Sequence, residues 1–278
     1  MERHSDQHLY SLEITGDKME DRLSDACHLR NLRLLRVLYL DPSVMMVKDS
    51  LLNQIGMSNH LRFLRIGTEV KSLPSSFSNL WNLETLWIEN ERSTLFKHKY
   101  SGALFSDKLV VEFSFPVLWN FPLTSDSLST IARLPNLEEL FLSSTIMQKE
   151  EWNMGEEDTF ENLKYLELYE VTLAKWEVGE ESFPVLEKLV LWECHKLREI
   201  PPNFGDICSL KIIKLVESPQ LEDSALAIKQ YVEDIMGVEK LQILDLNNIP
   251  LSKTGFSPLF RCLETKFTRV VYNVFDEF

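Results

Sequence analysis

The chain has 278 residues, of which 44% are hydrophobic and 26% are charged, and its formal net charge is −14. The hydrophobic share excludes a disordered chain, and no apolar run reaches the roughly 18 residues of a membrane span. The acidic balance disfavours nucleic acid and anionic lipid as partners, because both carry negative charge. We therefore expect no nucleic-acid binding and no membrane span.

The cysteines and the N-terminal residues indicate a reducing compartment. The first residues, MERHSDQHLY, lack the apolar core of a signal peptide. The sequence holds no Asn-x-Ser/Thr sequon, and its four cysteines form no CxxC pair. These features predict a cytoplasmic chain rather than a secreted one.

A leucine pattern repeats along most of the chain. In its clearest copy, Leu186, Leu189, Leu191, Cys194 and Leu197 follow one another at steps of two or three residues. The two-residue step predicts a strand with one buried face, and three-residue steps are typical of tight turns and short helical pieces. This pattern is the leucine-rich repeat. The first buried strand residue recurs every 22 to 31 residues, at Leu12, Leu38, Leu64, Leu86, a degenerate Val111, Leu140, Leu166, Leu189, Ile213 and Leu244.

One coil of this kind cannot bury its own apolar edge, so the copies must stack. We predict an α/β fold, a leucine-rich-repeat solenoid of about ten coils over residues 1–255. A curved parallel sheet lines the concave side of such a solenoid, and irregular turns and short helices form its convex side.

Residues 28–90 contain three clear copies of the repeat and a concentration of arginines. These arginines are solvated turn residues in one interpretation, and a docking patch for an acidic partner surface in the other. The set consists of Arg30, Arg33, Arg36, Arg62 and Arg65.

Residues 91–130 match the repeat poorly, and the sequence allows either a degenerate coil near Val111 or an insertion. The following coils carry acidic connecting segments at 150–158 and 177–181, and residues 101–200 together have a net charge of −11. Because both segments follow equivalent strands, we expect them to lie side by side, as a solvated acidic face.

The last part of the chain departs from the repeat. The stretch SALAIKQYVEDIMGVEKL predicts a helix with Ala225, Ile228, Val232 and Ile235 on one face and Gly237 at its end. Residues 256–278 have an apolar stripe at steps of three to four residues, which predicts a capping helix over the last coil. Their β-branched and aromatic content also allows an edge strand.

The motifs of common enzymes are absent from the sequence. It contains no phosphate-binding glycine loop, no nucleophile elbow, no HExxH and no kinase signature. Cys194 stands where the repeat uses Asn or Cys to hydrogen-bond the backbone of the turn, so we assign it a structural role. We expect no enzyme activity, no cofactor and no metal.

The remaining candidate site is a surface. In each predicted strand, the residues that flank the two buried positions point onto the concave sheet. Aromatic residues dominate this set, which is typical of protein interfaces, although lateral packing along the sheet also explains them. The predicted protein-binding residues are Tyr39, Phe63, Arg65, Trp87, Glu89, Phe141, Tyr165, Glu167, Tyr169, Trp192 and Lys214.

The wording of several segments resembles a known family. HLRNLRLLRVLYLD, LPSSFSNLWNLETLWI and above all the run from Trp176 to Pro201 resemble the leucine-rich-repeat region of plant coiled-coil nucleotide-binding immune receptors. Within that family, they are similar to late-blight resistance proteins of the nightshade family. The resemblance covers roughly residues 25–250.

The resemblance implies pathogen surveillance in the cytoplasm, leading to defence and the hypersensitive response. Its partners would be a pathogen effector or a guarded host protein. In this family the early basic coils commonly face the nucleotide-binding module and hold it inactive, a role that would suit Arg30, Arg33, Arg36 and Arg62. That module and its phosphate loop do not occur in the 278 residues.

We therefore expect a non-enzymatic protein-recognition solenoid. Two alternatives stay open. One is a substrate adaptor of the ubiquitin-ligase type, although residues 1–27 show no F-box helices. The other is a truncated receptor relic without an independent function.

Overall fold

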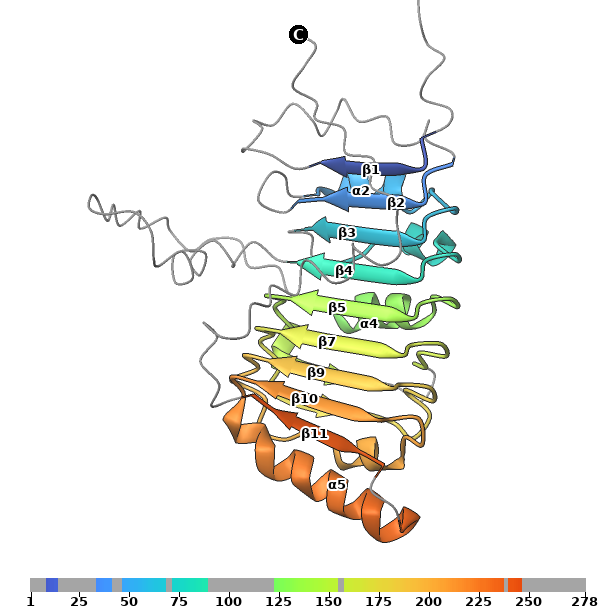
Figure 1. The fold of residues 1–278 in the computed structure, drawn as a ribbon. Coiled ribbons are helices and arrows are strands. Elements are labelled where there is room, and N and C mark those ends of the chain that lie inside the picture. Colours follow the sequence, from blue (N-terminus) through green and yellow to red (C-terminus); the bar gives the residue numbers. More distant parts are fainter. Residues whose placement is uncertain are drawn as a thin grey trace, which may run out of the picture.

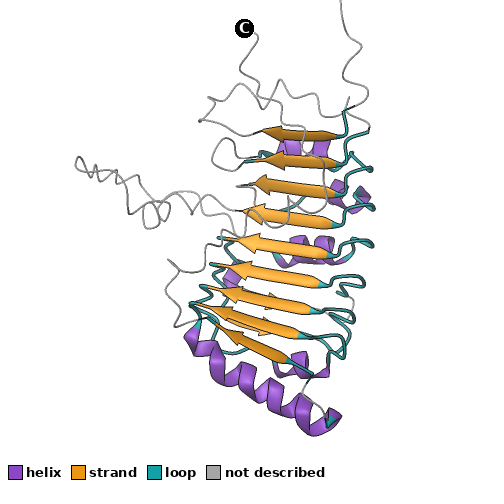
Figure 2. Cartoon of the chain, in the orientation of Figure 1, coloured by secondary structure: helices purple, strands orange, loops and turns teal. Residues whose placement is uncertain are grey.

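The computed structural model describes residues 9–14, 34–41, 47–68, 72–89, 123–154, 158–237 and 240–246. Within these ranges the strands stack in chain order, from β1 at one end to β11 at the other, and helices and turns lie behind them (Figures 1 and 2). This is the predicted leucine-rich-repeat solenoid.

The main sheet of the described residues has nine strands, and each strand pairs in parallel with the next. They are β1 (Ser11–Ile14), β2 (Val37–Leu40), β3 (Phe63–Gly67), β4 (Thr85–Glu89), β5 (Glu139–Ser143), β7 (Tyr165–Tyr169), β9 (Lys188–Trp192), β10 (Ile212–Val216) and β11 (Gln242–Asp245). A second sheet pairs β6 (Glu151–Asn153) with β8 (Lys175–Glu177) on the other side of the solenoid.

The predicted leucines set the register of the main sheet. Leu38 pairs with Leu64, Leu64 with Leu86, and Leu166 with Leu189. These four side chains are completely buried. Each coil thus contributes equivalent apolar groups to one continuous core, as the repeat requires.

One predicted strand position differs in the structure, and a second is not described. Val111 lies outside the described residues, and β4 pairs directly with β5, with Leu86 opposite Leu140. In the last coil, Ile243 rather than Leu244 pairs with Ile213. The prediction of Leu244 as a core residue is therefore wrong, and its side chain is 41% exposed.

Helices occupy the side of the coils opposite the sheet. They are α2 (Asp49–Ile55), α4 (Ser125–Ala132) and α5 (Glu222–Met236), with shorter 3-10 helices η3 (Ser75–Asn79), η5 (Gln148–Glu150), η6 (Pro202–Asp206) and η7 (Pro219–Leu221).

Helix α5 confirms the predicted C-terminal helix, and it lies next to β11 (Figure 1). Ala225, Ile228 and Val232 are buried, and Gly237 ends the helix in the left-handed conformation with φ 67°. Ile235 is 61% exposed, so only the first three of the four predicted positions belong to the core.

Aromatic side chains fill the convex half of the core. Trp152 and Trp176 stack at 5.3 Å between ring centroids, because β6 and β8 align them. Phe183 stacks between Phe160 at 5.2 Å and Phe204 at 5.8 Å. This cluster links three consecutive coils without using the sheet.

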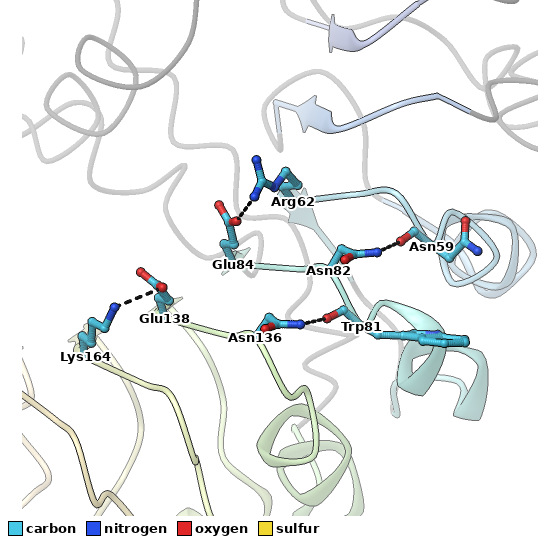
Figure 3. Close-up of polar contacts among 8 residues, drawn as sticks. All are labelled: Asn59, Arg62, Trp81, Asn82, Glu84, Asn136, Glu138 and Lys164. Atoms are coloured by element: carbon cyan, nitrogen blue, oxygen red, sulfur yellow. Dashed lines mark hydrogen bonds and ion pairs between the residues drawn. The ribbon is translucent and has the colours of Figure 1, made fainter.

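Asparagine side chains bridge consecutive coils at the turn before each strand. Asn82 donates to the carbonyl oxygen of Asn59 at 2.7 Å, and Asn136 donates to that of Trp81 at 2.6 Å (Figure 3). Asn162 repeats the contact with Pro135 at 2.6 Å. These bonds satisfy carbonyl groups that the turns leave outside the sheet ladder.

Candidate recognition surface

The strands present three rows of side chains on the face away from the core. The leading row consists of Val37, Phe63, Thr85, Glu139, Tyr165, Lys188 and Ile212. The middle row consists of Tyr39, Arg65, Trp87, Phe141, Glu167, Val190, Lys214 and Leu244. The trailing row consists of Glu89, Ser143, Tyr169, Trp192 and Val216. All the predicted concave residues fall in these rows.

The first half of the middle row is a continuous stack. The guanidinium of Arg65 lies over the rings of Tyr39 at 4.9 Å and Trp87 at 4.3 Å. Trp87 stacks on Phe141 at 4.7 Å, and Phe141 contacts Tyr165 at 5.0 Å. Trp87 is only 6% exposed. The lateral packing that we expected as an alternative therefore occurs here, from β2 to β7.

An ion pair closes this stack. Arg65 Nη2 lies 3.0 Å from Glu89 Oε2, and both side chains are largely buried. The cation is thus held between two aromatic faces and one carboxylate, an arrangement that stabilises a desolvated charge.

The second half of the face is more accessible. Tyr169 and Trp192 meet edge to face at 5.1 Å, and both are half-buried, as is Lys214. Val190 and Val216 form a buried apolar floor beside them. The face therefore changes from a closed stack in the early coils to an open surface in the later ones.

Glu167 is the buried carboxylate of the middle row. It accepts a hydrogen bond from the hydroxyl of Tyr165. Burial raises the pKa of Glu167 above its ordinary value, although Tyr165, Lys214 and Lys188 act in the opposite direction. Folding thus shifts the pKa of this carboxyl in the direction that favours its protonated form.

The variant Glu167→Gln should therefore be more stable than the parent at neutral pH, because the amide is neutral and still accepts from Tyr165. A raised folded pKa adds stability below the unfolded value and loses it as the pH rises through the folded value. The advantage of the variant should thus shrink as the pH falls towards the ordinary value of 4.5. Thermal unfolding of both proteins across this range measures it, and a difference that does not vary with pH would contradict the assignment.

Left-handed residues follow the strands of the later coils. Four residues here have a positive φ between 47° and 52°, a backbone conformation that is uncommon for residues other than glycine: Ser144, Glu170, Glu193 and Glu217. The N–H of Glu170 donates to the carbonyl of Trp192 at 2.8 Å, and that of Glu193 donates to Val216 at 2.9 Å. These trailing turns place three carboxylates in series beside the trailing row. The recurrence of Glu directly after each strand was the sequence signal for them.

The contacts of Cys194 agree with the structural role predicted for it. Its thiol is buried and donates to the carbonyl of Leu168 in the preceding coil at 3.3 Å. Burial raises its pKa to about 12.

We expect iodoacetamide to modify Cys208, which is exposed, but not Cys194 in the folded chain, because the thiolate is the reacting species. Peptide mapping at about pH 8 distinguishes the two sites, with the denatured chain as the control. Equal modification of both cysteines in the folded chain would contradict this account of the turn.

The described members of the predicted basic set lie in two places. Arg36 is exposed beside the ring of Tyr10, and Arg62 is half-exposed and pairs with Glu84 at 2.6 Å (Figure 3). The backbone N–H of Arg62 donates to the carbonyl of Arg36, so these two residues lie side by side at the start of adjacent coils. Arg65 lies on the concave face instead. Arg30 and Arg33 lie outside the described residues.

The acidic connecting segments lie side by side as predicted, because β6 pairs with β8. Part of their charge is neutralised locally: Glu150 pairs with Lys196 and Glu177 with Lys175. Glu156 and Glu157 lie outside the described residues.

Among the residues that the structure describes, no cluster of three or more His, Cys, Asp or Glu has a metal-binding arrangement. In the same ranges, no helix is both long enough and apolar enough to span a membrane.

Comparison with known proteins agrees with the repeat geometry. A putative late blight resistance protein homologue of Solanum demissum is 32% identical over 214 residues, which cover 67% of this chain and 16% of the relative. A second such homologue is 27% identical over 315 aligned positions, 79% of this chain and 23% of the relative. A late blight resistance protein of the same plant is 32% identical over 74% of this chain and 15% of its own length. The chain thus spans less than a quarter of these relatives.

No protein-family model matches the chain. Among solved structures, an internalin from Listeria monocytogenes is similar over 79% of this chain and 63% of its own, with 15% identity and a TM-score of 0.33. The fold defines a leucine-rich-repeat domain. Its relatives identify the chain as the leucine-rich-repeat region of a plant resistance protein.

Proposed function

We propose that this chain is the sensor region of a plant intracellular immune receptor, acts in the cytoplasm, and binds a pathogen effector or a guarded host protein on its concave face. The open half of that face carries the proposal. Tyr169 and Trp192 are half-buried aromatics on a rigid sheet, which is the composition of interface centres. The similarity to late blight resistance proteins supports the defence role.

The proposal is tested by comparing the proteins captured from Solanum leaf by three versions of the chain. The concave variant is Tyr169→Ala with Trp192→Ala, and the control is Trp81→Ala, which removes a 57% exposed ring away from the concave rows. We expect a partner that the parent and the control retain and that the concave variant loses about tenfold or more. Capture of the same proteins by all three would contradict concave-face recognition.

We also propose that the chain holds the nucleotide-binding module of the receptor inactive. In this proposal, the turns before the strands of the early coils contact that module. Arg36 and Arg62 support it, because both are accessible and begin neighbouring coils. A pull-down with the nucleotide-binding module of a late blight resistance protein tests it at low and high salt. Charge reversal at both arginines should abolish salt-sensitive binding, whereas reversal at Lys175 and Lys196 should not. Binding that ignores the arginines would refute this contact.

We also propose a cap at the C-terminal end of the solenoid. The outer edge of β11 has no neighbouring strand among the described residues, and Leu244 is exposed beside it. In our proposal, the apolar stripe of residues 256–278, which lie outside the described part, covers this edge as a cap. Such a cap would remove a sheet edge that is otherwise prone to aggregation.

A further inference from the structure

We infer that the concave face of β7, β9 and β10 is a docking site for an acidic protein segment, whose carboxylates sit over Lys188 and Lys214 and whose apolar side chains pack on Trp192. The inference rests on the proposed recognition function and adds the chemistry of the partner. Three observations support it: the side chains of these strands are accessible, their accessible charges are positive, and the indole N–H of Trp192 has no acceptor among the described residues.

The side chains of β7, β9 and β10 are more accessible than those of the early strands. Arg65, Trp87 and Phe141 in the early coils are each less than a tenth exposed and contact one another. A partner cannot reach them without breaking the stack. The later strands instead present half-buried side chains in all three rows, namely Tyr165, Tyr169, Lys188, Trp192, Ile212 and Lys214.

The accessible charge on these strands is positive. Their concave side carries only three charged residues, Glu167, Lys188 and Lys214, and Glu167 is buried. The ammonium of Lys188 lies 5.3 Å from the centre of the Tyr165 ring, which holds it on the face. Both lysines also interact electrostatically with the buried Glu167. Two cations against one carboxylate leave the accessible surface complementary to an acidic partner.

The charges around this site also orient the partner. Glu170 and Glu217 are half-buried and follow the trailing-row residues Tyr169 and Val216 directly in the chain, whereas Glu193 is buried. An acidic segment is repelled there and attracted towards the leading and middle rows, where the lysines lie. Its carboxylates therefore point towards the start of the strands.

The apolar part of the site lies between these charges. Val190 and Val216 form its floor, and Trp192 borders it. The indole Nε1 of Trp192 is buried and has no acceptor among the described residues. Unsatisfied buried donors are uncommon in proteins, and a small rotation of the ring would let a carboxylate or carbonyl of the partner accept from it.

The experiment selects a phage-displayed library of random peptides on the intact chain. Affinities of the recovered peptides are then measured against three variants. The first is Lys188→Gln with Lys214→Gln. Its matched control, Lys175→Gln with Lys196→Gln, removes the same charge from outside the concave rows. The third is Trp192→Phe, which keeps an aromatic ring but removes the indole N–H.

We expect peptides that combine Asp or Glu with aliphatic or aromatic residues. Loss of both concave lysines should weaken them about tenfold, with a strong salt dependence, and the control variant should bind like the parent. Trp192→Phe should weaken them about threefold or more without loss of thermal stability.

Two results would overturn the inference and are distinguishable. Peptides that depend on Trp192 but are neutral and insensitive to the lysines would refute the acidic partner and leave concave-face recognition standing. Peptides that bind all variants equally, or no enrichment at all, would refute both the acidic partner and the proposed recognition function.

Discussion

Replacement of Phe183 by alanine should lower the free energy of unfolding by about 3–5 kcal/mol. Phe183 is completely buried and stacks between Phe160 and Phe204, with Trp152 and Trp176 at its edges. Its removal opens a cavity among rings that come from three coils. Because the neighbours are large and rigid, they cannot close around it.

Urea denaturation of Phe183→Ala measures this loss. Phe183→Leu fills more of the space and should cost less, and Trp81→Ala should change stability by no more than about 0.5 kcal/mol, since Trp81 is mostly exposed. A cost below about 1 kcal/mol for Phe183→Ala would show that the convex aromatic cluster does not join the coils.

Replacement of Arg65 by leucine should cost about 3–5 kcal/mol, because it leaves the Glu89 carboxylate without its partner in a largely buried position. Arg65 also separates the rings of Tyr39 and Trp87, so both lose a contact. The loss is therefore expected to exceed that of a surface ion pair.

The double variant Arg65→Leu with Glu89→Leu separates these effects. Without either charge, the site needs no ion pair, and the double variant should be more stable than Arg65→Leu alone. Urea denaturation of the four proteins of this cycle gives the coupling energy. Additive losses would mean that the ion pair contributes nothing and that only the stacking matters.

The repeat spacing predicted the strands well because each coil obeys the same constraint. Two alternating apolar residues must meet the core, so Leu38, Leu64 and Leu189 could be located from the sequence alone. The constraint weakens at the last coil. There Ile243 and Leu244 are adjacent and both apolar, and only pairing with β10 decides which one faces the core.

The residues of the concave face could also be predicted from the sequence, but the difference between its closed stack and its open half could not. Alternation places Trp87 and Trp192 on the same face of the sheet, yet one belongs to the closed stack and the other to the open half. That difference depends on which residues lie opposite on the neighbouring strands. Which residues lie opposite depends on the length of every connection between strands, and the repeat pattern does not fix these lengths.

The turn contacts were missed for a different reason. Asn82 and Asn136 carry no apolar signal, so a search for leucine spacing passes over them, although an asparagine precedes the equivalent leucine in the coils of β4, β5 and β7. The glutamates of the trailing turns look like solvated charge in the sequence. Only the left-handed backbone of Glu170 and Glu193 shows that they continue the coil geometry.

Hydroxyl-radical footprinting of the chain, free and bound to a partner recovered by capture, tests the central claim most directly. The account predicts that binding protects Tyr169, Trp192 and Lys214, while Trp81 and the buried Trp87 remain unchanged. Protection of Trp81 with no change at Trp192 would contradict it, because recognition would then occur away from the open half of the concave face.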